Sequence, residues 1–454
     1  MATIRDNEFI LDLSNIYPTV TNVIFSIKEH RITDGQPWEG INRISISKGR
    51  CYLNVRAGRK GKGYVADWFK SKVSGGMAIV CSSGATRPDD LNFAFLGDLT
   101  LTFLGERNLT IPNLVIAQGH TGTTNNWWLG SSAMTPLKTI CTINFHAGSV
   151  NQFILNQTFP NWMSNIIDSV KLSNLSIPGT HNSGTKDVSN NVGGVRCQNY
   201  TIWEQLEDGI RFLDIRLCDK GDELNIYHNN TNCNLSFTRL LNQCKSFLEE
   251  NSKETIIMLL NSENTDGNIT ELFLRKYFTN SAYNSLFYKG NKIPFLGEAR
   301  SHIVPLYRFK IDDLALNKYG LNKENIGVIL NGWNWEGKSS DMGGDNFFIQ
   351  DQYDQHDTHK KYSLVTKYIS QSINDSDTFY INYNSIGYKV ANGRTPYMYA
   401  WGGLGIDPAM NPSLSEYLNS LPEKCKIGTI MLDFYNNKEG DKDNSIIAKI
   451  INRN

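Results

Sequence analysis

From residue 172 onward, short apolar runs that predict strands alternate with longer segments that predict helices. The segment at 237–250 shows the helical pattern clearly, because its apolar residues recur at the spacing of one helix face. Strands that alternate with helices over so long a stretch predict an α/β fold, here a distorted (β/α) barrel. The eight candidate strands span 172–177, 210–217, 223–228, 255–261, 302–308, 346–351, 378–384 and 428–434.

Polar residues gather in or just after the C-terminal halves of these candidate strands. In a (β/α) barrel the C-terminal ends of the strands meet on one face, and that face carries the active site. We therefore expect the polar residues to converge there. They are His181, Asp214, Arg216, His228, Glu263, Arg308, Asp351, Tyr353 and Asp433.

Transfer at a phosphodiester is the chemistry that suits these groups. Two histidines can serve as general base and general acid, because an imidazole titrates near neutral pH. An arginine can neutralise the charge that develops on phosphate oxygens, and a carboxylate can hold a histidine in one tautomer. A single histidine after a strand is more often structural, so the inference depends on the set. His356 and His359 lack the spacing of a helical metal site, and we interpret that segment as a solvated turn.

The N-terminal part has a different pattern. Residues 8–150 read as short strands with alternating apolar residues, separated by glycine and polar turns, without helical periodicity. We predict an all-β, sandwich-like accessory domain at 1–158 that binds or targets, and a catalytic barrel at 159–454. The segment at 159–162 is the expected junction.

Two features of the N-terminal part leave alternatives open. Trp127 and Trp128 follow a polar, glycine-containing stretch and could stack on a sugar or enter a lipid interface. The alternative is that one is core and the other covers a sheet edge. The basic run at 56–62 is interpreted as a solvated turn rather than as a contact with anionic lipid.

Composition excludes several classes of protein. The 45 basic and 45 acidic side chains balance, which disfavours a nucleic-acid binder. No apolar run has the length of a membrane-spanning helix, and the first 12 residues show no signal peptide. We expect a secreted or membrane-peripheral protein. The 8 cysteines form no CxxC pair, so we expect mostly free, buried thiols and no zinc site.

Several segments, in order, resemble the bacterial phosphatidylinositol-specific phospholipase C family (X domain). The resemblance covers roughly residues 160–450 and leaves the N-terminal domain unassigned. The segments are SIPGTHNSGT at 176–185, GIRFLDIR at 209–216, Tyr227-His228, KETIIM at 253–258, LGEAR at 296–300 followed by 303–306, and IQDQY at 349–353.

The resemblance implies a distorted barrel and an intramolecular transfer at an inositol phospholipid or a glycosyl-inositol anchor. It implies that His181, held by Asp433, deprotonates the inositol 2-hydroxyl, and that Arg216 stabilises the phosphorane. It implies that His228, supported by Asp214, protonates the departing diacylglycerol oxygen. The products would be diacylglycerol and inositol 1,2-cyclic phosphate. Positions matching the family's inositol-binding residues are Arg308, Asp351 and Tyr353, and we count Asn182 with them as a substrate-binding residue.

Three departures from the family qualify what the resemblance implies. Asn182 replaces an aspartate, as in calcium-dependent relatives, and Asp214 and Glu263 could add oxygen ligands. Arg216, however, occupies the place of a further carboxylate ligand there, so we expect metal-independent catalysis without a cofactor. A family lysine is missing at 261–262. The loop at 189–201 lacks the usual tryptophan, so membrane contact could lie at 333–335, at 397–401 or in the first domain.

Two rival functions remain open. One is a phosphodiesterase for another phospholipid headgroup, which would need a carboxylate-rich metal cluster. The other is an inactive lipid- or glycan-binding protein.

Overall fold

The computed structural model describes residues 4–58, 63–73, 77–81, 91–104, 108–121, 124–131, 142–148, 151–188, 194–263, 269–330, 340–344, 346–387, 393–437 and 445–454. The chain divides into two compact units. The first unit comprises Met1–Thr158 with Asp443–Ser445, and the second comprises Phe159–Lys442 with Ile446–Asn454.

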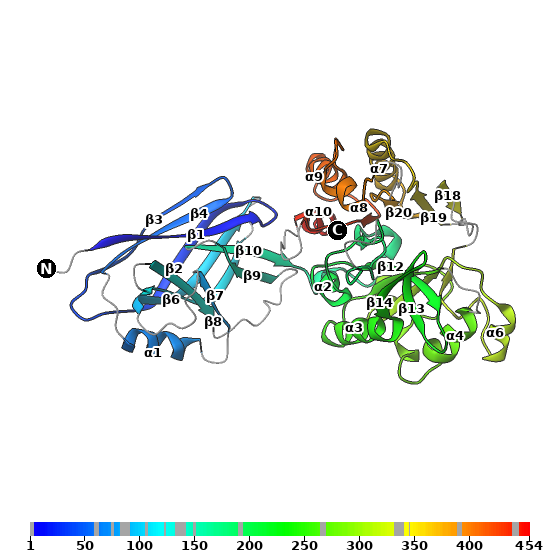
Figure 1. Ribbon diagram of the computed structural model, residues 1–454, viewed down its shortest axis with the longest axis horizontal. Helices are drawn as coiled ribbons and strands as arrows, with labels where there is room; N and C mark the ends of the chain where they lie inside the picture. Colours follow the sequence, from blue (N-terminus) through cyan, green and yellow to red (C-terminus); the bar gives the residue numbers. More distant parts are fainter. Residues whose placement is uncertain are drawn as a thin grey trace. The chain divides into compact units, whose positions relative to one another are not determined.

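The first unit contains two five-stranded sheets (Figure 1). Neighbouring strands pair antiparallel, except that β1 and β10 run parallel. This arrangement confirms the predicted N-terminal sheet domain. One sheet has the order β3 (Trp38–Ser47), β4 (Arg50–Ala57), β1 (Arg5–Asn15), β10 (Gln152–Thr158), β9 (Thr142–Ala147). The other has the order β2 (Val20–Ile32), β6 (Leu91–Phe103), β7 (Asn108–Thr121), β8 (Thr124–Ser131), β5 (Met77–Cys81).

Alternation of side chains along the strands builds the core of this unit. In β4, for example, Cys51, Leu53 and Val55 are fully buried while the residues between them are not. Phe9 of β1 and Trp127 of β8 come from different sheets and pack with ring centroids 4.9 Å apart in one apolar cluster. The two sheets therefore share a core, as in a sandwich.

One helix in this unit was not predicted. α1 (Gly63–Lys72) buries Val65 and Phe69 against Trp128 on the outer face of the second sheet. The helix is short and buries only three residues, too few for its periodicity to stand out in the sequence.

The hypothesis that Trp127 and Trp128 contact a ligand is wrong, because both side chains are almost fully buried. Successive residues of a strand point to opposite faces, so Trp127 enters the core between the sheets and Trp128 lies under α1. Arg56, at the start of the basic run, lies in β4 and pairs with Asp6 and Glu39. Residues 59–62 of that run lie outside the described residues.

The second unit is built on one large curled sheet with helices against it, which confirms the predicted distorted barrel (Figure 1). Eight strands run parallel along the path, and β18 adds antiparallel at one end. Among the described residues, no pairing joins β17 to β18, so the barrel is open there. The path is β17 (Val328–Ile329), β16 (Ile303–Tyr307), β15 (Ile256–Ser262), β12 (Phe212–Asp219), β11 (Ile177–Thr180), β21 (Thr429–Leu432), β20 (Phe379–Tyr383), β19 (Phe347–Asp351), β18 (Ser340–Gly344).

Helices connect most of these strands, as the alternating pattern predicts. α3, for example, buries Phe237, Leu240 and Phe247 on one face. The helices are α2 (Ile202–Glu207), α3 (Phe237–Glu250), α4 (Ile269–Phe273), α5 (Leu296–Ala299), α6 (Asp313–Lys318), α7 (Thr358–Ile373), α8 (Pro396–Trp401), α9 (Met410–Ser420) and α10 (Ser445–Ile451). None of the helices in the described part of the chain is long and apolar enough to cross a membrane.

Two of the eight strand predictions are wrong in part. Residues 172–174 form a 3₁₀ turn, and the first barrel strand begins at Ile177. The predicted strand at 223–228 is not a parallel barrel strand, because β13 (Leu224–His228) pairs antiparallel with β12 and forms a hairpin with β14 (Thr231–Ser236). Asn229 makes this two-residue turn possible, since its positive φ of 51° is one that asparagine tolerates. The eighth parallel strand is the short β17.

The cysteines with described sulfur atoms are free, as predicted, and all but Cys425 are buried: Cys51, Cys197, Cys218, Cys233, Cys244 and Cys425. Burial raises the pKa of the Cys51, Cys197, Cys233 and Cys244 thiols.

Candidate active site

Strand register brings three predicted site residues to one point. Thr180 at the end of β11 pairs with Leu432 of β21 on one side and with Leu213 of β12 on the other. The residue that follows each of these three in the chain is polar: His181 after Thr180, Asp433 after Leu432 and Asp214 after Leu213. Parallel register therefore sets His181 between two carboxylates at the C-terminal end of the sheet.

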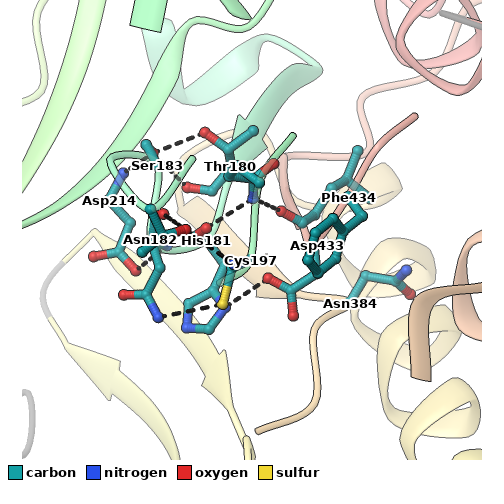
Figure 2. A network of polar contacts seen from close by, with 12 residues as sticks. Thr180, His181, Asn182, Ser183, Cys197, Asp214, Asn384, Asp433 and Phe434 are labelled. Atoms are coloured by element: carbon teal, nitrogen blue, oxygen red, sulfur yellow. Dashed lines mark hydrogen bonds and ion pairs between the residues drawn. The ribbon is translucent and has the colours of Figure 1, made fainter. Parts of the chain in front are cut away.

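His181 and Asp433 form a buried pair (Figure 2). His181 Nδ1 lies 2.8 Å from Asp433 Oδ1, and the two residues are 6% and 2% exposed. Nδ1 donates its hydrogen to the carboxylate, so Nε2 carries the lone pair. The ring edge of Tyr383 packs on the imidazole with centroids 5.8 Å apart. The pair thus presents a histidine in one tautomer and one orientation.

Arg216 supplies positive charge next to this lone pair. Its Nη2 lies 3.1 Å from His181 Nε2, and its guanidinium lies 3.8 Å from Asp214 and 3.6 Å from Glu263. Burial opposes the charge of Arg216, but Asp214 and Glu263 outweigh burial and raise the pKa of the guanidinium. Arg216 therefore stays a cation, and it stands between the oxygen donors that a calcium ion would need.

His228, the last residue of β13, is held by a backbone carbonyl. Its Nδ1 lies 2.9 Å from the oxygen of Val195 and 3.3 Å from the side-chain amide of Asn182. Burial and the charge of Arg216 lower the pKa of His228 to about 3. His228 is thus a neutral imidazole at neutral pH, with its Nδ1 hydrogen directed at Val195.

Asn182 follows His181 in the chain and places its side-chain amide next to His228. Its backbone N–H donates to Asp214 Oδ2 at 3.2 Å, and its φ of 45° is left-handed, a conformation that asparagine and aspartate adopt readily. Asp214, predicted to support His228, makes its hydrogen bond to Asn182 instead (Figure 2). Its remaining effect on His228 is electrostatic and raises the pKa of that imidazole.

The segment Val195–Gln198 joins the two histidines, a feature that the sequence reasoning missed. Val195 accepts from His228, while the buried Gln198 donates its amide to the carbonyls of His181 and Leu432, both at 2.8 Å. The N–H of Phe434 donates to the carbonyl of Cys197 at 2.8 Å. A glutamine 17 residues after His181 carries no signal in the sequence, because its partners are backbone atoms.

A second buried ion pair connects strands that are not neighbours. Arg308 follows β16, Asp351 ends β19, and Arg308 Nη2 lies 2.9 Å from Asp351 Oδ2. Burial raises the pKa of Asp351 although Arg308 opposes this. Tyr353 lies two residues beyond and is only partly buried, and the field of Asp351 adds to burial in raising its pKa.

The aromatic segments proposed for membrane contact fall into two groups. Trp401, at the end of α8, is partly buried and donates its indole N–H to the carbonyl of Phe434, so it packs against the site. Trp333 and Trp335 lie outside the described residues, as do residues 189–193 of the loop after the first histidine. Asp357 caps α7 at its N-terminus, so the prediction of a solvated turn is wrong for His359, which lies in the first turn of the helix, and only His356 precedes the cap.

Fold and site together define a class: a (β/α)-barrel protein whose histidine, arginine and carboxylate side chains meet at the C-terminal ends of parallel strands. Residues 171–308 match the family model described as phosphatidylinositol-specific phospholipase C, X domain. This match and the relatives below support the resemblance to the bacterial phosphatidylinositol-specific phospholipase C family over this part of the chain.

Curated relatives agree with this assignment. A 1-phosphatidylinositol phosphodiesterase of Staphylococcus aureus (strain Newman) is 26% identical over 319 residues, covering 66% of this chain and 96% of that protein. The corresponding protein of Listeria monocytogenes is 28% identical over 289 residues, covering 61% of this chain and 81% of that protein.

Solved structures agree on the fold. A phosphatidylinositol-specific phospholipase C from Staphylococcus aureus with incorporated pentafluoro-Phe has a TM-score of 0.56 at 24% identity, over 65% of this chain and 97% of that one. The Listeria monocytogenes enzyme has a TM-score of 0.53 at 25% identity, over 65% of this chain and 98% of that one.

Proposed function

We propose that this protein cleaves phosphatidylinositol, or the inositol linkage of a glycosyl-inositol anchor, by metal-independent intramolecular phosphodiester transfer. The observation that carries the proposal is the buried pair of His181 and Asp433 with Arg216 against its free nitrogen. The products would be diacylglycerol and inositol 1,2-cyclic phosphate.

His181 acts as the general base. Its Nε2 takes the proton of the inositol 2-hydroxyl as that oxygen attacks phosphorus, and Asp433 stabilises the imidazolium that forms. In the protein without substrate, Arg216 Nη2 lies within hydrogen-bond distance of His181 Nε2. The guanidinium then moves onto the phosphate oxygens, where it stabilises the charge of five-coordinate phosphorus.

His228 acts as the general acid for the diacylglycerol oxygen. Burial and, after it, the charge of Arg216 hold the pKa of His228 low in the protein without substrate, and an anionic phosphate bound to Arg216 relieves the second of these effects. Protonation of His228 is therefore coupled to substrate binding. The bond from phosphorus to the glycerol oxygen breaks as His228 donates its proton to that oxygen. His181 then releases the proton that it accepted to solvent, and His228 takes up a proton from solvent.

Arg308, Asp351 and Tyr353 form the inositol-binding group in this proposal. The charged pair Arg308 and Asp351 offers a donor and an acceptor to ring hydroxyls, and the partly buried Tyr353 offers a stacking face. The first unit has an apolar core of its own, and we assign it a separate role in binding a membrane, a glycan or a protein.

Incubation with phosphatidylinositol vesicles and excess EDTA tests the reaction, with phosphorus NMR of the water-soluble product. We expect inositol 1,2-cyclic phosphate from the parent protein, and none from His181→Ala. His359→Ala is the matched control, since His359 is exposed at the start of α7 and should leave the product unchanged.

Other outcomes point to the rival functions. Turnover with calcium but none with EDTA would mean that the oxygen donors around Asn182 bind metal and that the metal-free mechanism is wrong. No turnover in either condition, with binding to vesicles that survives His181→Ala, would indicate a lipid-binding protein. Turnover of another phospholipid, with none of phosphatidylinositol, would indicate a phosphodiesterase for a different headgroup.

A further inference from the structure

A thiol lies beside the candidate general base and has no place in the proposed reaction. Cys197 is fully buried, accepts a hydrogen bond from the Asn182 amide at 3.6 Å, and lies in the same cluster as His181 and Asp433 (Figure 2). Imidazole nitrogen, thiol sulfur and carboxylate oxygen of these three residues lie within 4.8 Å of one another. This is a donor set that Zn²⁺ prefers.

The second carboxylate oxygen of Asp433 adds an independent observation. Asp433 is 2% exposed, and in the described part of the chain its Oδ2 has no hydrogen-bond partner. Buried carboxylate oxygens are normally paired, so this atom is an available acceptor or ligand. The three-residue cluster therefore contains a free ligand atom besides the histidine contact.

Charge around the cluster permits a cation. Arg216 contacts His181 at Nε2, not at the Nδ1 that faces Asp433. Asp214 and Glu263 already balance its charge. Asp433 adds a further negative charge, so the local field does not exclude a divalent ion.

We propose that His181, Cys197 and Asp433 form an inhibitory zinc site. Zn²⁺ takes Nδ1, Sγ and a carboxylate oxygen, with water in the fourth position. Tetrahedral bonds of about 2.0–2.1 Å hold nitrogen and oxygen ligands about 3.3 Å apart, so the present 2.8 Å contact opens slightly. Binding releases one proton, from Sγ, and moves the imidazole hydrogen from Nδ1 to Nε2, so it strengthens as pH rises.

Zinc at this position regulates the proposed phospholipase. The metal takes the place of the hydrogen on Nδ1, and Nε2 then carries the imidazole hydrogen, so His181 no longer accepts the proton of the attacking hydroxyl. The inhibitory half of the proposal rests on the proposed function, whereas metal binding does not.

Binding is therefore measured apart from activity, on the full chain. Co²⁺ replaces Zn²⁺ as a spectroscopic probe, and competition with a chromophoric chelator gives the zinc affinity. We expect one equivalent of metal, a thiolate-to-cobalt charge-transfer band, and affinity roughly 10- to 100-fold weaker in Cys197→Ala. Cys244→Ala is the matched control, since Cys244 is equally buried in α3 and outside the cluster.

Activity on phosphatidylinositol vesicles is then followed with zinc and with EDTA. We expect zinc to inhibit the parent and Cys244→Ala reversibly, and Cys197→Ala to be resistant to zinc. If Cys197→Ala does not fold, Cys197→Ser serves in its place. Equal affinity in the Cys197 variants, or no thiolate band in the parent, would overturn the zinc site. A protein that binds zinc through Cys197 but cleaves no phosphatidylinositol would keep the site and reject the proposed function.

Discussion

His181 and Asp433 are 252 residues apart in the chain, yet His181 Nδ1 lies 2.8 Å from Asp433 Oδ1. Their strands are parallel neighbours, and Thr180 and Leu432, the residues just before them, are register partners. The same register places Asp214 on the other side. The geometry of the candidate base therefore follows from how three strands pair.

Asp433→Asn should lower kcat by about 10²- to 10⁴-fold, because the imidazolium loses its compensating charge and the tautomer is no longer fixed. Vesicle assays at saturating substrate measure the effect. Asp222→Asn, an exposed carboxylate paired with Arg275 and Lys276, is the control and should retain parental kcat. Similar kcat for Asp433→Asn and the parent would contradict the assignment of His181 as base.

Asn182→Asp should raise the pKa of His228, since a carboxylate replaces an amide 3.3 Å from its Nδ1. More of the general acid is then protonated at neutral pH, so the pH–rate profile should extend to higher pH. NMR titration of His228 measures the shift directly. Asn234→Asp is the control, because Asn234 is exposed and has a similar positive φ of 57°. An unchanged titration would show that Asn182 does not act on His228.

Gln198→Met should lower kcat by about 10- to 100-fold with little change in KM, because the bonds that hold the His181 backbone are lost. The low-field NMR signal of the Nδ1 hydrogen between His181 and Asp433 should shift. Gln205→Met is the control: Gln205 is equally buried and donates to the carbonyls of Ser183 and Tyr200 instead. If both variants lose the same activity, Gln198 has only a structural role.

Arg211→Met should destabilise the second unit by about 3–5 kcal/mol, because it leaves Glu254 as an uncompensated buried charge. Arg211 Nε lies 2.9 Å from Glu254, and its other nitrogens donate to backbone carbonyls that include Phe159 and Pro160. Denaturant unfolding measures the loss. Lys245→Met removes an exposed pair with Glu249 and should cost less than about 1 kcal/mol.

His228 should make the second unit sensitive to acid. Burial and Arg216 lower its pKa from 6.5 to about 3, so between these values the unfolded chain binds a proton that the folded protein does not. The contribution of His228 to stability is complete above pH 6.5 and is lost as pH falls toward about 3. In His228→Gln the free energy of unfolding should therefore fall less steeply over this window, by about 2–4 kcal/mol in total. Parallel curves for variant and parent would contradict the lowered pKa.

The sequence by itself determined the periodic pattern of the barrel and the polar residues at its strand ends. These signals are local, because strand and helix periods and strand-end positions are written in neighbouring residues. His181, Asp214, Arg216 and Asp433 could be named for this reason, whereas Asn182 was named through the resemblance to a family. The pattern did not reveal α1 or the hairpin of β13 and β14, where the segments are short and the periods ambiguous.

Only the tertiary structure decided which groups meet. Trp127 and Trp128 look alike in sequence, but their burial depends on a second sheet and on α1. The support of His228 comes from the carbonyl of Val195, and the bonds of Gln198 end on backbone atoms. Every residue carries such backbone groups, so side-chain identity cannot mark which of them will pair. Chain packing and strand register select these contacts.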